Sequence, residues 1–538
     1  MSEQLLEVRD LTVRSGSTVL IDDVSFAVTR GSRTGLIGES GSGKTLTALA
    51  IMGLLPDGLD ASGDVILNGT PLHELSERQL VTHRGNSMSM IFQEPMTALN
   101  PVMRIGRQIA EPLQIHRGME RRDAIDAAVE LLESVGIDEP ERRARSFTYQ
   151  LSGGQRQRAM IAMALACSPG LVIADEPTTA LDVTVQAQVL RVLQDRVAAS
   201  DAALILITHD LPVVAAVTAN VIVLREGEVV ERGATQAVFA HPSNVYTRAL
   251  VDSVPPMSRS IQVPAKVTPD TEPGDAIVEM RDVVRTYRLP RRRFGDTAPV
   301  IHAVDHVSLA VLSGETFGIV GESGSGKSTL ARLMMGLERP SSGEVVVDGI
   351  DVASGRNLRP LRDVAQMVFQ DPMGSLDPRM LVHDIVAEPL RSLHVAGDHA
   401  ARVAELLDAV RLPADAGRRY PHEFSGGQRQ RIAIARALAP APKLLIADEP
   451  VSALDMSVQT ATLELLDRLK RDFDLTMVFI SHDLSVVHEI CERVIVLQRG
   501  RIVETGSADG VLRAPQEQYT QALIAAIPRL DGTLLAAG

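Results

Sequence analysis

The sequence predicts an α/β fold that is built twice within one chain. A short apolar strand, a glycine-rich loop and a helix follow one another at residues 36–51, and the same arrangement returns at residues 318–334. The motifs after each loop also recur in the same order, in these pairs: Glu7 and Glu279, Lys44 and Lys327, Gln93 and Gln370, Ser152 and Ser425, His209 and His482. A chain of 538 residues is too long for a single core. We therefore expect two homologous domains in tandem.

A proline-rich segment separates the two halves. Residues 253–276 have almost no large apolar side chain and contain Pro255, Pro256, Pro264, Pro269 and Pro273. This composition is typical of a partly stiffened linker. The predicted domains are therefore residues 1–252 and 277–538, with the linker at 253–276. The spacing between paired motifs varies, and the clearest insertion is an extra loop near residues 288–298 of the second half.

The two glycine-rich loops predict phosphate binding. Glycines let the backbone curl so that several N–H groups and the start of the next helix face one anion. A flexible turn is the alternative for such a stretch, but the strand before each loop and the helix after it exclude that interpretation. The lysines would reach the terminal phosphates, and Thr45 and Ser328 would place a hydroxyl on Mg²⁺. The residues expected at the nucleotide are Gly38, Ser40, Gly41, Gly43, Lys44 and Thr45 in the first half, and Gly321, Ser323, Gly324, Gly326, Lys327, Ser328 and Thr329 in the second.

Two further motifs follow each loop. A predicted strand ends in a glutamine, Gln93 in the first half and Gln370 in the second. Next, a serine and two glycines open a helix and form a second possible anion-binding helix start. A single copy would fit an N-cap serine with loop glycines, and the repetition favours binding. The residues are Ser152, Gly153 and Gly154, with Ser425, Gly426 and Gly427.

Adjacent carboxylates then stand at the end of a continuous apolar run in each half, Asp175-Glu176 and Asp448-Glu449. A run that is apolar on both faces predicts a buried parallel strand, and α/β sheets present ligands at the carboxyl ends of such strands. Phosphate chemistry needs one carboxylate near Mg²⁺ and another near the attacking water. A histidine ends the next apolar run, at His209 and at His482.

This ordered set resembles the ATP-binding-cassette ATPases, and the resemblance covers nearly the whole chain twice. It implies two tandem P-loop domains, each with a mixed or parallel sheet core, an antiparallel β subdomain and a helical signature subdomain. It also implies an ATPase in which Asp175 and Asp448 support Mg²⁺ and Glu176 and Glu449 act as general base. His209 and His482 would sense the terminal phosphate.

The same resemblance assigns the remaining motifs. Gln93 and Gln370 would contact ATP and Mg²⁺, directly or through water, and link the nucleotide to transmembrane partners. Residues 180–182 and 453–455 match the segment that crosses between cassettes. The two cassettes of one chain would pair head to tail, so that the Lys44 loop faces Ser425-Gly426-Gly427 and the Lys327 loop faces Ser152-Gly153-Gly154. Both sites keep their glutamate and histidine, so we expect both to hydrolyse ATP.

One position departs from the family pattern. Aligning Glu7 with Glu279 places Ser15 opposite Tyr287, where the family usually stacks an aromatic ring on adenine. We expect Tyr287 to bind the base and the first site to be weaker, unless another residue substitutes in the first half. Base stacking contributes on the order of 1–3 kcal/mol in single-stranded nucleic-acid binding.

Longer stretches resemble the oligopeptide, dipeptide and nickel importer ATPases more specifically. They are residues 92–101, 174–186 and 241–250, with weaker versions at 369–378 and 518–523. This resemblance implies two separate permease subunits, an extracytoplasmic binding protein and a peripheral location on the cytoplasmic face of the membrane. Many relatives carry a cysteine cluster after the segment that corresponds to residues 246–250. The two cysteines here, Cys167 and Cys491, lie elsewhere, so we expect no iron–sulfur cluster.

Composition bears on the alternative functions. A net charge of −14, from 68 acidic and 54 basic residues, disfavours a nucleic-acid-binding protein. The sequence has no apolar run of about 18 residues and no recognisable leader, which predicts a cytosolic chain. The main rival is a soluble twin-cassette translation factor that acts on the ribosome. Such proteins usually join their halves by a long charged helix, and the proline-rich linker argues against it. The identity of the transported substrate does not follow from the sequence.

Overall fold

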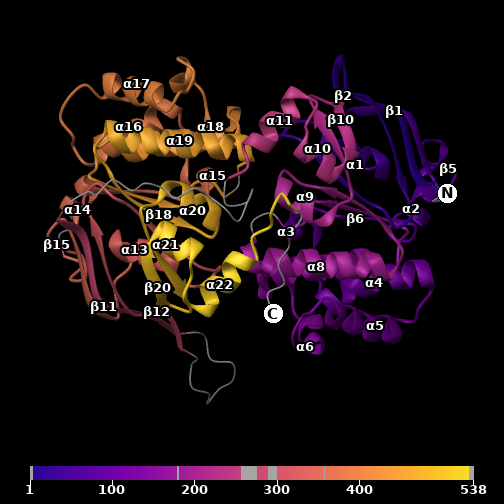
Figure 1. The fold of residues 1–538 in the computed structure, drawn as a ribbon, viewed down its shortest axis with the longest axis horizontal. Coiled ribbons are helices and arrows are strands. Elements are labelled where there is room, and N and C mark those ends of the chain that lie inside the picture. Colours follow the sequence, from indigo (N-terminus) through magenta and orange to yellow (C-terminus); the bar gives the residue numbers. More distant parts are fainter. Residues whose placement is uncertain are drawn as a thin grey trace. The chain divides into compact units, whose positions relative to one another are not determined.

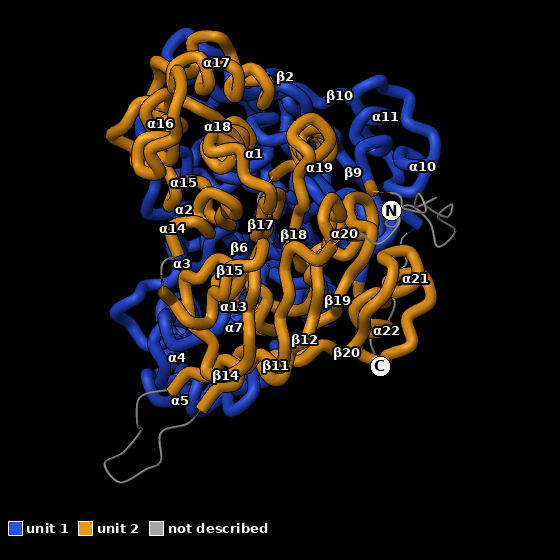
Figure 2. The backbone as a smooth tube through the Cα atoms, turned by 90° about the vertical axis from the view of Figure 1, so that its left-hand side faces the viewer, with its two compact units in different colours: residues 1–254, 258–261, 527–536 blue, residues 255–257, 262–526, 537–538 orange. Residues whose placement is uncertain are grey.

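The computed structural model describes residues 4–178, 181–255, 275–288, 300–356, 358–452 and 454–531. These residues form two compact units, one within residues 1–254 and the other within residues 262–526 (Figure 2). α11 ends at Asp252 and β11 begins at Ala276. Most of the predicted linker, at 256–274, lies outside the described residues, as does most of the predicted insertion, at 289–299.

Each unit contains a four-stranded antiparallel sheet, which agrees with the predicted β subdomain. In the first unit its order is β2-β1-β4-β5, with β1 at Gln4–Ser15, β2 at Thr18–Thr29, β4 at Leu59–Leu67 and β5 at Thr70–Pro71. In the second unit the order is β12-β11-β14-β15, with β11 at Ala276–Arg288, β12 at Val300–Leu312, β14 at Ser342–Val347 and β15 at Ile350–Asp351. Alternating burial along β1 and β11 matches a sheet with one face packed on a core.

A six-stranded mixed sheet forms the core of each unit. In the first unit the order is β10-β9-β3-β8-β7-β6, with β3 at Arg33–Ile37, β6 at Met88–Ile91, β7 at Leu171–Asp175, β8 at Ala203–Ile207, β9 at Asn220–Arg225 and β10 at Glu228–Ala234. β10 pairs antiparallel with β9, and the other pairs are parallel. β7 lies between β6 and β8 and is buried throughout, which confirms the strand predicted from its apolar run.

The second unit repeats this sheet in the order β16-β17-β18-β13-β19-β20. Its strands are β13 at Thr316–Val320, β16 at Ala365–Val368, β17 at Leu444–Asp448, β18 at Thr476–Ser481, β19 at Arg493–Gln498 and β20 at Arg501–Ser507. The predicted strands that end in glutamine are slightly too long, because β6 ends at Ile91 and β16 ends at Val368. Gln93 and Gln370 each stand two residues beyond the strand, at a bend in the chain.

Helices cover the sheets and form a separate layer in each unit. In the first unit they are α1 Lys44–Met52, α2 Glu77–His83, α3 Pro95–Ala98, α4 Ile105–Arg117, α5 Arg121–Ser134, α6 Pro140–Ala144, α7 Gly153–Leu165, α8 Val183–Ala199, α9 Leu211–Val217, α10 Thr235–Ala240 and α11 Val245–Asp252, with 3₁₀ turns at Leu72–Glu74 and Thr148–Gln150. The helices α4 to α7 pack on one another through buried alanine, leucine and isoleucine side chains, and this is the predicted helical subdomain.

The second unit has the corresponding helices. They are α13 Lys327–Met334, α14 Arg359–Val364, α15 Pro372–Ser375, α16 Val382–Ser392, α17 His399–Ala409, α18 Gly426–Leu438, α19 Met456–Asp472, α20 Leu484–Ile490, α21 Ala508–Arg513 and α22 Gln518–Ala525, with 3₁₀ turns at Ala416–Arg418 and Pro421–Glu423. Within this unit, α16 to α18 and the β11/β12 sheet lie at opposite ends of the core sheet (Figures 1 and 2). No helix among the described residues is both long enough and apolar enough to cross a membrane.

Candidate active sites

The glycine-rich loop of each unit lies between the central strand of the core sheet and a helix. In the first unit it joins β3 to α1, and two of its glycines are required by close packing. A Cβ atom at Gly38, which has φ +152°, would lie 2.2 Å from the carbonyl oxygen of Leu224, and Gly43 has φ +99°. Gly321 and Gly326 have φ +148° and +111° in the second unit. Since a side chain would clash at these points and positive φ favours glycine, the loop conformation depends on these residues.

The loop lysines are buried and are bonded to the loop itself. Lys44 Nζ donates hydrogen bonds to the carbonyl oxygens of Gly38 at 2.7 Å and Glu39 at 2.8 Å. Lys327 Nζ makes the same two bonds in the second loop, at 2.7 and 2.9 Å. A primary ammonium group in a ring of backbone groups is a suitable partner for phosphate oxygens. The prediction that these lysines belong to an anion-binding loop fits this geometry.

A hydroxyl and a carboxylate meet where the first helical residues approach the end of the carboxylate strand. Thr45 Oγ1 donates to Asp175 Oδ1 at 3.3 Å, and Ser328 Oγ donates to Asp448 Oδ1 at 3.3 Å. Hydroxyl and carboxylate oxygens are the ligand types that Mg²⁺ prefers, so these pairs fit the predicted metal role. Burial raises the pKa of Asp175 to about 6, although the hydrogen bond from Thr45 opposes the shift. Burial also raises the pKa of Asp448.

The glutamate after each strand joins the predicted glutamine and histidine. In the first unit Gln93 Nε2 donates to Glu176 Oε2 at 2.7 Å, and His209 Nδ1 lies 3.0 Å from Glu176 Oε1. In the second unit Gln370 Nε2 donates to Glu449 Oε2 at 2.7 Å, and His482 Nδ1 lies 3.2 Å from Glu449 Oε1. Three side chains that are far apart in sequence are thus brought together in each unit. This is the arrangement expected when one carboxylate receives a proton from water and its neighbours hold it in place.

The electrostatics of the second group favour an ionised carboxylate. Burial would raise the pKa of Glu449, but the hydrogen bond and the positive charge of His482, with smaller contributions from Lys327 and Gln370, lower it below its ordinary value. For the same reason, the pKa of His482 is raised despite its burial. Glu449 and His482 therefore each favour the charged form of the other, and the lowered pKa keeps the Glu449 carboxyl group ionised.

Both glutamates have a strained backbone. Glu176 has φ +45° and Glu449 has φ +49°, in the left-handed region that residues other than glycine seldom adopt. In each case the backbone N–H of the glutamate is fixed by the neighbouring strand, because it donates to the carbonyl oxygen of Ile207 at 2.8 Å or of Ile480 at 2.9 Å. Strain of this kind is often found at functional sites. Nothing in the local sequence predicts it.

The serine and glycines that open α7 and α18 form helix starts of the predicted kind. Gln155 N–H donates to Ser152 Oγ at 3.3 Å, and Ser425 accepts the same bond in the second unit at 3.4 Å. Both serines therefore cap their helices, as expected from the alternative interpretation of this motif as an N-cap serine with loop glycines. The next glycine in each motif, Gly153 or Gly426, is exposed. The hydrogen bonds of Ser152 and Ser425 do not extend to the loop lysine of their own unit.

The aromatic residue predicted at the base is bound to its own unit. Tyr287 donates its hydroxyl to the carboxylate of Glu338, and the Arg285 guanidinium lies 4.8 Å from the ring centroid. Ser15 occupies the hairpin end of β1, where it pairs with Thr18. Because β1 and β11 pair with equivalent neighbours, Ser15 and Tyr287 take equivalent places.

Other predicted segments lie near these sites. Asp182 caps α8, since its Oδ1 accepts a hydrogen bond from Val185 N–H at 3.0 Å. Ala180, two residues before Asp182, and Ala453 in the second unit lie outside the described residues.

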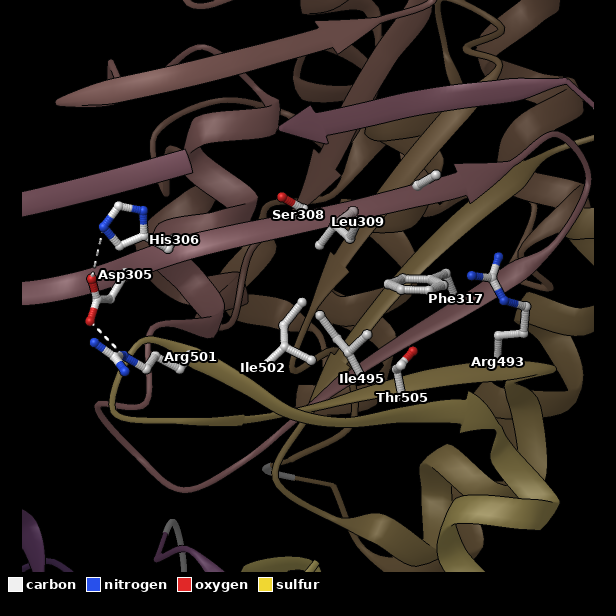
Figure 3. A pocket seen from close by; sticks show the side chains of 11 residues that line it. Asp305, His306, Ser308, Leu309, Phe317, Arg493, Ile495, Arg501, Ile502 and Thr505 are labelled. Carbon is white, nitrogen blue, oxygen red and sulfur yellow. Dashed lines mark hydrogen bonds and ion pairs between the residues drawn. The ribbon is translucent and has the colours of Figure 1, made fainter. Parts of the chain in front are cut away.

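A groove of about 550 Å³ in the second unit, between β12 and β20, is lined by Asp305, His306, Arg501, Phe317 and their neighbours (Figure 3). It contains no residue that the sequence predicted at the nucleotide.

Two kinds of contact to the loops were not predicted. Ser42 is buried in the first loop, and its carbonyl oxygen accepts a hydrogen bond from Gly227 N–H at 3.1 Å, which ties the loop to the β9–β10 turn. Tyr246 accepts a hydrogen bond from Glu39 N–H, and Tyr519 accepts one from Glu322 N–H. The two tyrosines stand in similar stretches of both halves. That repetition was the signal in the sequence from which a shared role of the tyrosines could have been predicted.

The fold and these sites define a protein with two nucleotide-hydrolysing P-loop cassettes. Comparison with known proteins agrees. The ABC transporter family model matches residues 21–179 and 304–452, and the model of the oligopeptide/dipeptide transporter C-terminal region matches residues 230–276 and 503–536. The chain belongs to the ABC transporter family, and it is an ATPase with two ATP-binding cassettes.

Full-length relatives are also similar. The chain is 44% identical to the glutathione import ATP-binding protein GsiA of Escherichia coli strain K12 over 94% of this chain and 86% of that protein. The same values hold for the protein of that name from Shigella flexneri. Among solved structures, the dimeric cassette MJ0796 bound to ADP and phosphate is 32% identical, with a TM-score of 0.39 over 43% of this chain and 98% of that one.

Proposed function

We propose that this chain is the ATP-hydrolysing subunit of an importer for peptides or peptide-like substrates, and that it works at the cytoplasmic face of the membrane. The observation that carries this proposal is the 44% identity to glutathione import ATP-binding proteins along almost the whole chain. The match of both halves to the oligopeptide/dipeptide transporter region supports it. By the same relationship, its partners are two permease subunits and an extracytoplasmic protein that selects the substrate. The ribosome-bound alternative has no comparable support.

Within each unit the residues have distinct tasks. Glu176 and Glu449 accept the proton of the attacking water, and His209 and His482 hold these carboxylates and contact the terminal phosphate. Lys44 and Lys327 bind phosphate oxygens. Mg²⁺ would be held by Thr45 with Asp175 and by Ser328 with Asp448, and when bound it neutralises charge on the phosphates. Gln93 and Gln370 contact the general bases Glu176 and Glu449. They would connect these glutamates to the segments that meet the permeases.

We further propose that the two cassettes pair head to tail, so that each ATP lies between the loop of one and the serine–glycine motif of the other. The packing of the motif supports this proposal. A Cβ atom at Gly154 would lie 2.4 Å from Val185 Cγ1, so packing explains that glycine. A Cβ atom at Gly153 would meet no atom closer than 3.8 Å, and one at Gly426 would meet none within 4 Å. Gly153 and Gly426 are exposed positions where a bare backbone suits a bound anion.

Cysteine cross-linking tests this pairing. Ser40→Cys combined with Ser425→Cys should form a disulfide when ATP is bound to a hydrolysis-deficient variant, and less without ATP. Ser40→Cys combined with Ser152→Cys is the matched control, because both positions belong to one unit. The native cysteines, Cys167 and Cys491, are buried and give little background. Equal cross-linking of both pairs would refute the head-to-tail arrangement.

Copurification tests the importer assignment. The tagged chain, expressed at its native level and extracted gently from membranes, should bring down two polytopic permeases and a substrate-binding protein. The ligand of that binding protein would then identify the substrate class. Recovery with ribosomes and without any permease would refute the importer while leaving the ATPase intact.

A further inference from the structure

The phosphate loop of each unit is supported from outside by one tyrosine hydroxyl. In the first unit Glu39 N–H donates to Tyr246 Oη at 2.9 Å, over a sequence separation of 207 residues. In the second unit Glu322 N–H donates to Tyr519 Oη at 3.2 Å. In both units, the glutamate that follows the first glycine of the loop thus contacts a tyrosine at the start of the last helix, α11 or α22. The contact is thus present at equivalent positions of the two homologous units.

The supported residue is also the one that holds the lysine. Glu39 N–H is bound by the tyrosine, and Glu39 carbonyl oxygen accepts a hydrogen bond from Lys44 Nζ at 2.8 Å. In the second unit the corresponding lysine bond of Glu322 is 2.9 Å long. Fixing the N–H of this residue restricts its backbone, and hence the place of the carbonyl that orients the ammonium group. Pre-organised binding groups lose less conformational entropy when a ligand binds.

The tyrosine is itself firmly placed. Tyr246 is the second residue of α11, and its N–H donates to the N-cap Asn244 Oδ1 at 2.8 Å. The turn before α11 is bound to the β10 residue Glu231, which accepts hydrogen bonds from Ser243 N–H at 2.8 Å and Ser243 Oγ at 2.6 Å. Burial opposes the shift, but these hydrogen bonds lower the pKa of Glu231 to about 2. The carboxylate therefore stays ionised at neutral pH and holds the turn. The Arg225 guanidinium also lies 5.2 Å from the Tyr246 ring centroid.

The second unit has an equivalent support. Glu504 of β20 accepts hydrogen bonds from Gln516 N–H at 2.8 Å and Glu517 N–H at 3.3 Å, directly before α22. Tyr519 is the second residue of that helix. Both glutamates and both tyrosines fall within the segments that match the oligopeptide/dipeptide transporter C-terminal region. These segments follow the catalytic motifs in sequence, but they reach back to the loops.

We propose that Tyr246 and Tyr519 are positioning residues, which hold the backbone of the phosphate loops in the conformation that binds ATP. This inference rests on the ATP sites proposed above. It assigns a task within the cassette to the late helices α11 and α22, namely to brace the loop that holds the phosphates.

The test removes only the hydroxyls. Tyr246→Phe should raise the Kd for a fluorescent ATP analogue about threefold to tenfold at the first site, because one hydrogen bond to the loop is lost. Tyr519→Phe should do the same at the second site. Each is measured in the full chain with the other loop disabled, by Lys327→Ala or Lys44→Ala respectively. The kcat at saturating ATP should change much less than KM. The thermal midpoint should shift by no more than about 2 °C, whereas a general structural defect would lower it further.

The chain offers matched controls. Tyr149→Phe and Tyr420→Phe remove hydroxyls from exposed tyrosines outside the loops, and they should leave Kd unchanged. Glu231→Gln should weaken binding in the same direction as Tyr246→Phe, because it loosens the turn before α11. If both loop-disabling substitutions leave nucleotide binding intact, the proposed ATP sites fail. If those substitutions abolish binding but both phenylalanine variants bind like the parent, the positioning role alone is refuted.

Discussion

The two units contain the same reactive groups in the same contacts, yet their surroundings differ. The hydroxyl–carboxylate pairs Thr45–Asp175 and Ser328–Asp448 are both 3.3 Å long. The bonds from Gln93 to Glu176 and from Gln370 to Glu449 are both 2.7 Å long. Outside this inner set some contacts still correspond, such as those of Tyr246 and Tyr519 with the loops, and others differ. The comparison teaches that the two units share the inner set of side chains, whereas the residues at the predicted base position and at the outer sheet edge differ.

The first difference lies at the hairpin end of the antiparallel sheet. In the second unit Glu338 accepts a hydrogen bond from Tyr287 and lies 3.2 Å from Arg285 Nε, so that the ring is fixed in a polar network. The first unit has Ser15 and Val13 at the places of Tyr287 and Arg285. The second unit therefore has an aromatic ring at this hairpin position, and the first unit has Ser15 in its place.

The second difference lies at the outer edge of the core sheet. In the second unit Arg501 Nε donates to Asp305 Oδ2 at 2.6 Å (Figure 3). His306 Nδ1 lies 2.7 Å from Asp282 Oδ1. The hydrogen bond from Arg501 lowers the pKa of Asp305. In the first unit a corresponding groove, of about 680 Å³, has Asp10, Asp22, Asp23 and Glu228 among its lining residues, together with Arg232. Neither edge holds catalytic residues, so this difference should affect folding more than turnover.

The largest expected effect tests whether the inner sets are equivalent. Glu176→Gln and Glu449→Gln should each lower ATP turnover at least about twofold, and the double variant should lose about 100-fold or more, because the general bases are gone. Steady-state phosphate release measures this, and Glu226→Gln is an exposed control. If one single variant keeps the full rate, that unit is not hydrolytic and the equivalence fails.

The hairpin difference should show in affinity. Tyr287→Ser should raise the Kd for ATP at the second site about tenfold, and Ser15→Tyr should lower it at the first site, because stacking on the base is lost or gained. Fluorescent ATP analogue binding measures this, with the other loop disabled by its lysine-to-alanine substitution. A first site that already binds as tightly as the second, and gains nothing from Ser15→Tyr, would show that another group supports its base.

The pH dependence sharpens the comparison at the metal position. Since the pKa of Asp175 is about 6, its carboxyl takes up a proton as the pH falls through this value and loses its capacity to bind Mg²⁺. The Mg²⁺-dependent affinity of the first site should fall about tenfold between pH 7 and pH 5. The effect of this group on the stability of the fold has the opposite pH dependence. A raised pKa means that the folded state binds the proton more tightly, so this group favours folding as the pH falls from about 6.

Nucleotide titrations with and without Mg²⁺ at each pH measure this effect, again with Lys327→Ala in the background. Asp175→Asn should remove the Mg²⁺-dependent part of the pH profile. An equal loss of affinity in the absence of Mg²⁺ would assign the effect to another group. The pKa of Asp448 is raised as well, so the second site should lose affinity in the same direction.

The smallest effect concerns the sheet edge. Arg501→Glu gives the second unit the acidic side chain that the first has at Glu228, and it breaks the exposed pair with Asp305. The thermal midpoint should fall by no more than about 2 °C, because exposed ion pairs contribute little. ATP turnover should not change. Arg499→Glu makes the same charge change on the adjoining turn and is the control. A large loss of activity in Arg501→Glu alone would show that this edge takes part in function.

The sequence by itself determined the duplication, the α/β class and most of the inner site. The glycine loops, the buried strand before Asp175 and the repeated motif order are local patterns, because backbone conformation and burial of an apolar run depend mainly on neighbouring residues. Together with the resemblance to the ABC ATPases, they predict that Lys44, Thr45 and Glu176 belong to one site and that Lys327, Ser328 and Glu449 belong to another.

Only the tertiary structure decided the contacts that join distant segments. The strained backbone of Glu176 is set by a bond to the next strand, and the pKa of Asp175 is set by its burial beneath the loop. The bond from Glu39 to Tyr246 spans 207 residues, and no local pattern determines which backbone group a buried hydroxyl will meet. Strand order brings these residues together, and strand order is a property of the whole sheet.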